Sequence, residues 1–98
     1  MTINKTANGS NLELALIGRL DTTTAPQLEN EVKTSLGGVK ELTMNFADLE
    51  YISSAGLRVL LAAQKIMNKQ GEMVIKHAND DIKEVFDITG FADILTLE

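Results

Sequence analysis

Two adjacent serines, Ser53 and Ser54, are the hydroxyl groups whose surroundings in the sequence suggest chemistry. They lie between an apolar stretch that ends at Phe46 and a helical pattern that starts with Leu57. Serine is favoured at helix N-termini because its hydroxyl oxygen accepts a hydrogen bond from an unpaired amide of the first turn. The pair therefore has two interpretations: a helix N-cap with a structural role only, or a hydroxyl group presented for phosphorylation.

Phosphorylation asks little of the chain itself, because a kinase supplies the base and the nucleotide. A phosphate adds about −1.5 to −2 charges and strong acceptor oxygens. At a helix N-terminus these charges meet unpaired amides and a favourable helix dipole, so the fold tolerates them. A partner docked around the serine would instead have to bury a charge that has no counter-charge. A phosphate at this position would thus act as a switch for binding.

A serine hydrolase would use the same kind of hydroxyl, but the sequence argues against one. The sharp turn of a hydrolase nucleophile needs a glycine two residues before and two residues after the serine. Gly56 follows Ser54 by two residues, whereas Ile52 precedes it by two. His77 is the only histidine and would have to be the general base. We therefore expect no catalytic residue in this chain.

Nucleotide and metal sites are also poorly supported. Residues 53–56 lack the lysine and the spaced glycines of a phosphate-binding loop. With one histidine and no cysteine, carboxylates are the main candidate metal ligands, and Asp80 and Asp81 resemble the cap of a helix. We therefore expect neither a metal ion nor a cofactor bound to this chain.

Composition restricts the class of protein further. The chain has 98 residues, of which 44% are hydrophobic and 23% charged, as expected for one globular domain. A net charge of −5 argues against nucleic acid as a partner, since phosphate neutralisation needs clustered lysine and arginine. No apolar run reaches the roughly 18 to 20 residues of a membrane helix, and the N-terminus lacks the apolar core of a secretory signal. We expect a cytoplasmic protein that is not inserted into a membrane.

The hydrophobic pattern predicts elements in the order β-β-α-β-α-β-α, followed by a short closing segment. Strands are expected at residues 2–8, 11–18, 42–46 and 73–77. Helices are expected to begin near Pro26, at the serines and at Asp80 or Asp81, and to end near residues 36, 70 and 89. The residues between Phe46 and the serines are interpreted as a short polar turn, and residues 91–97 as a strand or helical turn.

Strands that alternate with helices predict an α/β fold with a largely parallel sheet. The hairpin of the first two strands adds an antiparallel strand at one edge. In such sheets, functional sites gather where the carboxyl ends of strands meet the N-termini of helices. Here those positions are residues 21–25 and 48–56, which we expect to lie side by side on one functional face.

Residues 18–25, Gly-Arg-Leu-Asp-Thr-Thr-Thr-Ala, and residues 48–57 resemble the two signature segments of STAS domains. More narrowly, they resemble the stand-alone anti-sigma factor antagonists of bacteria. Residues 71–74 and 85–91 fit the later strand and the last helix of that family. The resemblance covers essentially the whole chain, and it implies a single STAS domain over residues 1–98. The implied fold is a small mixed sheet with helices packed mainly on one side.

The resemblance also implies a mechanism called partner switching. The unphosphorylated antagonist binds an anti-sigma factor that is also a serine kinase, and so frees the sigma factor. The kinase phosphorylates the antagonist on a serine at the start of the second helix, which ends the interaction. A PP2C-type phosphatase reverses the modification. ATP belongs to the kinase, so the resemblance implies no cofactor for this chain.

Carried onto this sequence, the family pattern places the phosphorylated serine at Ser54. Ser53 occupies a position where well-known members carry aspartate, and it is the second candidate. The implied partner-binding residues are Asp21, Thr22, Thr23, Thr24, Asp48, Tyr51, Ser53, Ser54, Ala55, Gly56 and Arg58. The alternative is a STAS domain that is never phosphorylated and docks as a subunit of a lipid-transport ATPase or a sensory complex.

Overall fold

Four strands and three α-helices make up the computed structural model, which describes residues 1–98. The strands are β1 (Thr2–Asn8), β2 (Asn11–Leu20), β3 (Glu41–Ile52) and β4 (Glu72–Lys76). The helices are α1 (Ala25–Ser35), α2 (Ser54–Gln70) and α3 (Asp80–Thr89), and a short 3-10 helix, η1, spans Phe91–Asp93. The predicted element order is confirmed. None of the helices has the length and apolar character needed to cross a membrane.

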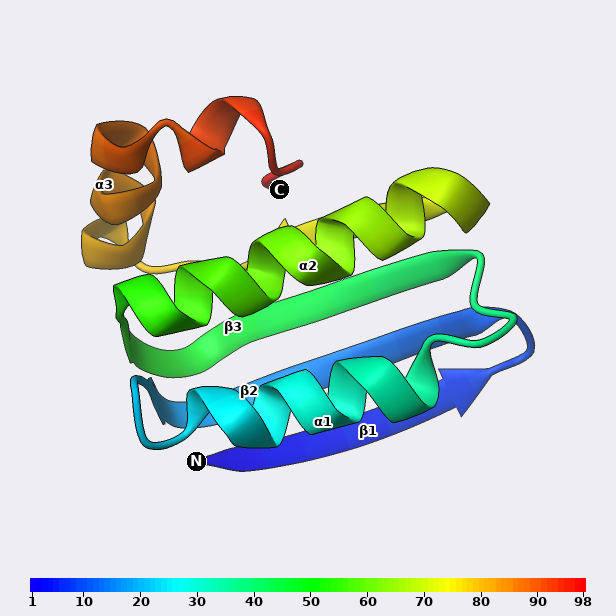
Figure 1. Ribbon diagram of the computed structural model, residues 1–98. Coiled ribbons are helices and arrows are strands. Elements are labelled where there is room, and N and C mark those ends of the chain that lie inside the picture. Colours follow the sequence, from blue (N-terminus) through cyan, green and yellow to red (C-terminus); the bar gives the residue numbers. More distant parts are fainter.

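The strands form one mixed sheet in the order β1-β2-β3-β4. β1 and β2 pair antiparallel, whereas β2 with β3 and β3 with β4 pair parallel. The two parallel connections run through α1 and α2, which lie next to each other over the same face of the sheet (Figure 1). The structure therefore confirms the predicted α/β fold, with its parallel centre and its antiparallel N-terminal hairpin.

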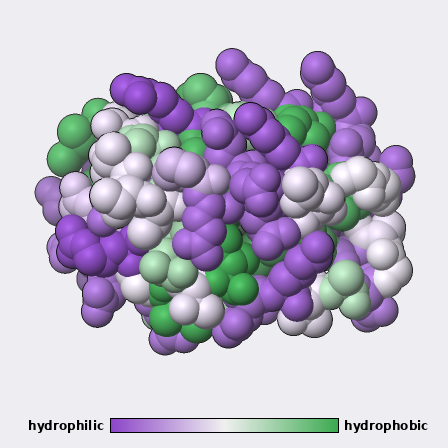
Figure 2. Space-filling view, turned by 60° about the horizontal axis from the view of Figure 1, so that its bottom comes forward, coloured by the Kyte–Doolittle hydropathy of each residue, from purple (hydrophilic) through white to green (hydrophobic).

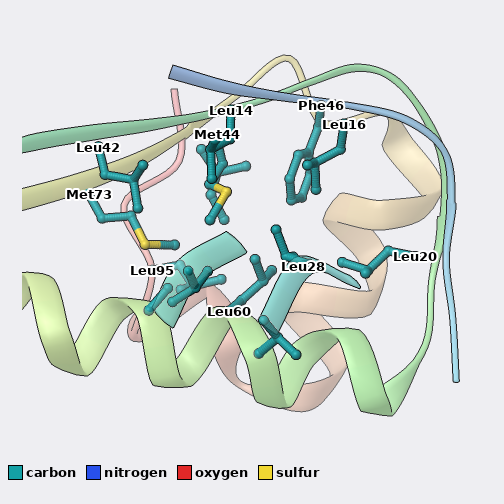
Figure 3. Close-up of a cluster of buried hydrophobic side chains, with 14 of the residues drawn as sticks. Leu14, Leu16, Leu20, Leu28, Leu42, Met44, Phe46, Leu60, Met73 and Leu95 are labelled. Atoms are coloured by element: carbon teal, nitrogen blue, oxygen red, sulfur yellow. The ribbon is translucent and has the colours of Figure 1, made fainter. Parts of the chain in front are cut away.

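The hydrophobic core lies between the sheet and this helix layer (Figure 3). Alternate residues of β2, such as Leu14 and Leu16, are fully buried on the helix side. Leu28 of α1 and Leu60 of α2 meet them from the other side, and both are also fully buried. Polar residues dominate the outer surface seen from the α1 and β1 side, which shows only small hydrophobic areas (Figure 2).

The residues after Phe46 continue β3, so the predicted polar turn is wrong. Up to Phe46 the buried residues of the strand are two apart, but the next ones, Leu49 and Ile52, follow at intervals of three. A spacing of three does not fit the alternation of a regular strand. For that reason the second half of β3 resembled a turn in the sequence.

Two β-bulges explain the changed spacing. β2 advances from Ala15 to Ile17 while β3 advances from Asn45 to Asp48, so β3 contains one extra residue. A second extra residue, Glu50, follows a few positions later. Each bulge inserts one residue, which shifts the alternation of side chains by one position. Leu49 and Ile52, each three residues after the previous buried residue, therefore stay on the buried face of β3. As a result, the strand reaches the start of α2 without losing its packing against the helices.

The ends of the remaining elements agree with the sequence pattern to within a residue or two. The N-cap of α3 differs from the prediction. It is Asn79, whose Oδ1 accepts a hydrogen bond from the Ile82 amide at 2.8 Å. Asp80 and Asp81 lie in the first turn instead of capping it. The closing segment combines both predicted forms, because it begins as η1 and ends with Leu97 paired parallel to Ile75 of β4.

Candidate functional site

The two serines at the start of α2 have different environments. Ser53 is the N-cap and is half-buried, and its Oγ accepts a hydrogen bond from the Gly56 amide at 3.4 Å. Its own amide donates to the Leu20 carbonyl oxygen at 2.9 Å. Ser54 is the first helical residue and is exposed, and its hydroxyl has no partner within the protein. The structural and the chemical interpretations of the pair thus fall on different residues.

Gly56 fixes the position of this helix end. A Cβ atom at Gly56 would lie 2.7 Å from Leu20 Cγ and 2.9 Å from Ile52 Cγ1. The first turn of α2 therefore packs directly against the ends of β2 and β3. Gly56 is itself buried and offers no side chain to a partner, so it can affect a binding surface only by holding Ser54 in place.

The loop before α1 is organised by the carboxylate of Asp21. Its Oδ1 accepts hydrogen bonds from the Thr23 hydroxyl at 2.7 Å and from the Thr23 and Thr24 amides at 3.0 and 3.1 Å. The Thr24 hydroxyl donates to the Arg19 carbonyl oxygen at 2.8 Å, so it closes the loop and does not cap α1. The pKa of Asp21 is held below its usual range, chiefly because the Thr23 hydroxyl donates to the charged form.

We expect Asp21→Asn to lower the free energy of unfolding at neutral pH, because asparagine keeps an acceptor oxygen but loses the charge. A carboxyl group whose pKa is lowered by folding stabilises the protein above its unfolded pKa of about 3.9. That contribution is lost as the pH falls through the lower folded pKa. Urea unfolding at a series of pH values should thus show a gap between wild type and variant that narrows below about pH 4.

The control for this prediction is Asp93→Asn, which changes an exposed carboxylate that accepts no side-chain hydrogen bond. The free energy of unfolding of Asp93→Asn should differ little from that of wild type across the same series of pH values. A gap of the same size for both variants would mean that the Asp21 hydrogen bonds contribute no measurable stability.

The Asp21 loop and the start of α2 line one groove, so the two segments lie side by side as the topology predicts. The groove has a volume of about 210 Å³. Its lining residues are Thr22, Ala25, Pro26, Glu29, Ala55, Arg58 and Val59. Both helices begin at this end of the sheet (Figure 1). The groove is small and shallow, which suits a few side chains of a protein better than a large ligand.

A second exposed feature lies next to the loop, at Tyr51 and Arg19. The Arg19 guanidinium carbon stands 4.3 Å from the centroid of the Tyr51 ring, which is a cation–π contact. Arg19 Nε also lies 3.8 Å from Asp21 Oδ2. Tyr51 and Asp21 are candidate binding residues from the sequence, whereas Arg19 is not. The β-bulge at Glu50 brings Arg19 opposite Tyr51, and no pattern in the sequence reveals that register.

Of the candidate partner-binding residues, only Thr22, Ala55 and Arg58 line the groove. Asp48 is not among them. It borders a separate hollow, together with Ile17, Leu49 and Asn79. His77, the residue considered as a catalytic base, is exposed in the connection between β4 and α3 and lines neither hollow. No cluster of three or more histidine, cysteine, aspartate or glutamate side chains is arranged to hold a metal ion.

The comparisons with known proteins agree on the class to which this chain belongs. The STAS domain family matches residues 2–98. Over 81 residues the chain is 40% identical to BtrV of Bordetella bronchiseptica, whose name places it among the anti-sigma factor antagonists; the match covers 81% of this chain and 70% of BtrV. Over 98 residues it is 31% identical to the anti-sigma-B factor antagonist of Staphylococcus aureus, covering 97% of this chain and 90% of that protein.

Among solved structures, the fold is similar to that of SpoIIAA, an anti-sigma factor antagonist. The TM-score is 0.78 for its unphosphorylated form and 0.77 for the phosphorylated form from Bacillus. Each match covers 99% of this chain, and 87% and 91% of the respective SpoIIAA chains, at 18% identity. At this identity the similarity concerns the fold alone.

This chain therefore belongs to the STAS domain family. Within that family it groups with the anti-sigma factor antagonists, which have a regulatory and not an enzymatic role. The resemblance that residues 18–25 and 48–57 suggested is confirmed.

Proposed function

We propose that this chain is an anti-sigma factor antagonist that works by partner switching in the cytoplasm. Its unphosphorylated form binds an anti-sigma factor that is also a serine kinase, which releases the sigma factor. The observation that carries this proposal is the exposed, unbonded hydroxyl of Ser54 at the start of α2. Ser53 already caps the helix, so modification of Ser54 does not require the cap to open.

The chemistry of the switch needs only the Ser54 hydroxyl from this chain. Ser54 Oγ attacks the γ-phosphorus of ATP held by the kinase, ADP leaves with the bridging oxygen, and the hydroxyl proton passes to a base of the kinase. The phosphoserine then carries about −1.5 to −2 charges at the edge of the groove. A PP2C-type phosphatase returns the serine by hydrolysis of the phosphate ester.

The docking surface in this proposal combines the groove and its margin. Thr22, Ala55 and Arg58 line the groove, and Tyr51 with Arg19 stands exposed beside the Asp21 loop. Tyrosine and arginine are among the residue types that most often dominate binding energy at protein interfaces. A phosphate at Ser54 would lie beside this surface. A docked partner would exclude the water that hydrates the phosphate, which makes binding unfavourable.

The test compares Ser54→Ala, Ser54→Asp and Ser53→Ala with wild type, incubated with ATP and a candidate kinase anti-sigma factor. Intact-mass and site-mapping spectrometry should find one phosphate in wild type, at Ser54, and none in Ser54→Ala. Calorimetry should show that Ser54→Ala binds as wild type does and that Ser54→Asp binds at least about tenfold more weakly, a loss of about 1.4 kcal/mol. Ser53→Ala should still be phosphorylated but be less stable by about 1 kcal/mol, because it lacks the N-cap.

Equal affinities of Ser54→Ala and Ser54→Asp for the partner would contradict the switch. A complex that forms normally while no phosphate is found would instead support the alternative function, a constitutive docking subunit. A phosphate found only on Ser53 would move the switch to the capping residue, and its addition should then destabilise the start of α2.

A further inference from the structure

Arg58 is an unpaired cation one helical turn after Ser54. It lies four residues further along α2 and is exposed. The protein contains four ion pairs, formed by Lys5, Arg19, Lys33 and Lys76, and Arg58 takes part in none of them. Its side chain also donates no hydrogen bond, although it lines the groove beside Ser54. The sequence alone identified Arg58 only as a member of the docking surface.

Helix geometry places the two side chains on the same face of α2, within reach of each other. Residues four apart on a helix have Cβ atoms about 5–6 Å from each other. Side chains on a helix lean towards its N-terminus, so the long side chain of Arg58 extends over the turn that starts with Ser54. An acidic group placed four residues before a basic one is also the more favourable of the two orders.

The carboxylates in the groove and in the adjoining loop already have partners. Glu29 is the only carboxylate that lines the groove, and its Oε1 lies 3.7 Å from Lys33 Nζ. The Asp21 carboxylate is occupied by Thr23, Thr24 and Arg19. α2 has no acidic residue in its first turn. A phosphate on Ser54 would therefore meet Arg58 without displacing an existing ion pair.

We infer that Arg58 binds the phosphate group of phosphorylated Ser54 within the same helix. This inference rests on the proposed use of Ser54 as the phosphorylated residue. The planar guanidinium can donate two parallel N–H···O bonds to phosphate oxygens, which a lysine at this position cannot do. The contact neutralises part of the added charge and draws the phosphate along α2 towards Arg58, which lines the groove. Arg58 thus passes from the docking surface of one state to an internal contact of the other.

The test uses protein synthesised with phosphoserine at position 54, so that no kinase is involved. Three versions are compared: the native sequence, Arg58→Gln, and Lys65→Gln as the control. Lys65 lies on the same helix and is exposed, and its loss removes the same charge. The Cα atom of Lys65 lies about 16 Å from that of Ser54 along the helix axis. This is beyond the distance of about 8 Å over which exposed charges interact at physiological salt.

The measured quantity is the second pKa of the phosphate, obtained by phosphorus NMR at increasing pH. It should be lower in the native sequence than in Arg58→Gln by about 0.3 unit or more, because the guanidinium stabilises the dianion. Lys65→Gln should leave it nearly unchanged, and Arg58→Lys should give an intermediate value. A general structural role of Arg58 would not change this pKa.

Equal phosphate pKa values in the native sequence, Arg58→Gln and Arg58→Lys would overturn the inference, and the proposed function would stand. Conversely, failure of any kinase to modify Ser54 would count against the proposed function. It would not change the phosphate titration, because that experiment uses synthetic phosphoserine protein. Arg58→Lys keeps the test decisive if Arg58→Gln does not fold, since it retains the size and charge of the side chain.

Discussion

Gly71→Ala is expected to lower the free energy of unfolding by about 3 kcal/mol or more, although it adds a single methyl group. A Cβ atom at Gly71 would lie 1.9 Å from the carbonyl oxygen of Lys40 and 2.6 Å from its carbonyl carbon. That oxygen accepts a hydrogen bond from the Glu72 amide at 2.9 Å, so it cannot move without losing the bond. Backbone on both sides would have to shift, at the point where β3 and β4 begin.

Glycine is required at position 71 because there is no space for a side chain, and not because of the backbone conformation. Its φ of 177° is an extended value that any residue adopts. Gly37→Ala is the matched control, because a Cβ atom there would meet nothing within 4 Å. Chemical denaturation should show a large loss for Gly71→Ala and almost none for Gly37→Ala. Similar small losses for both would mean that the connection after α2 yields easily.

Leu60→Ala should cost about 2–5 kcal/mol of stability, the range for removing a fully buried leucine side chain. Leu60 has no exposed surface and projects from α2 into the centre of the core (Figure 3). Its truncation leaves a cavity that the sheet on one side and α1 on the other cannot fill without moving. Any loss of partner binding in this variant would follow from the loss of folded protein.

Leu61→Ala provides the comparison, because it makes the same chemical change at the next residue. Leu61 is only half-buried, so the loss should be clearly smaller than at Leu60. Thermal and urea unfolding of the two variants measure the difference directly. Equal losses would contradict the orientation of α2 described above, since that orientation places one leucine in the core and the other at its margin.

The sequence predicted the element order and the α/β class because β2 and the three helices follow regular periods. Leucines alternate along β2, and the buried apolar residues of α1 and α2 recur at helical spacing, so local pattern and final burial agree. The second half of β3 could not be predicted in this way. Its two bulges depend on register with β2, which is a property of the pair of strands and not of either one.

The candidate site was predicted in part for the same reason. Residues at the carboxyl ends of strands were expected to gather, and Thr22 and Ala55 do line one groove. The separate roles of Ser53 and Ser54 depend on the helix starting one residue later than the first serine, which the sequence leaves open. The contact of Arg19 with Tyr51 and the unpaired state of Arg58 depend on which side chains meet in space.

The pairing of Leu97 with Ile75 also has a consequence for how the protein behaves at high concentration. β4 is the last strand of the sheet, and Met73, Val74 and Ile75 make it one of its more apolar strands. The Ile75 amide donates to the Thr96 carbonyl oxygen at 2.9 Å, and the Glu98 amide donates to the Ile75 carbonyl oxygen at 2.8 Å. These bonds occupy backbone groups that would otherwise recruit a strand from another molecule. Residues 96–98 thus protect the sheet against edge-to-edge aggregation, whereas β1 at the opposite edge relies on polar side chains such as Lys5.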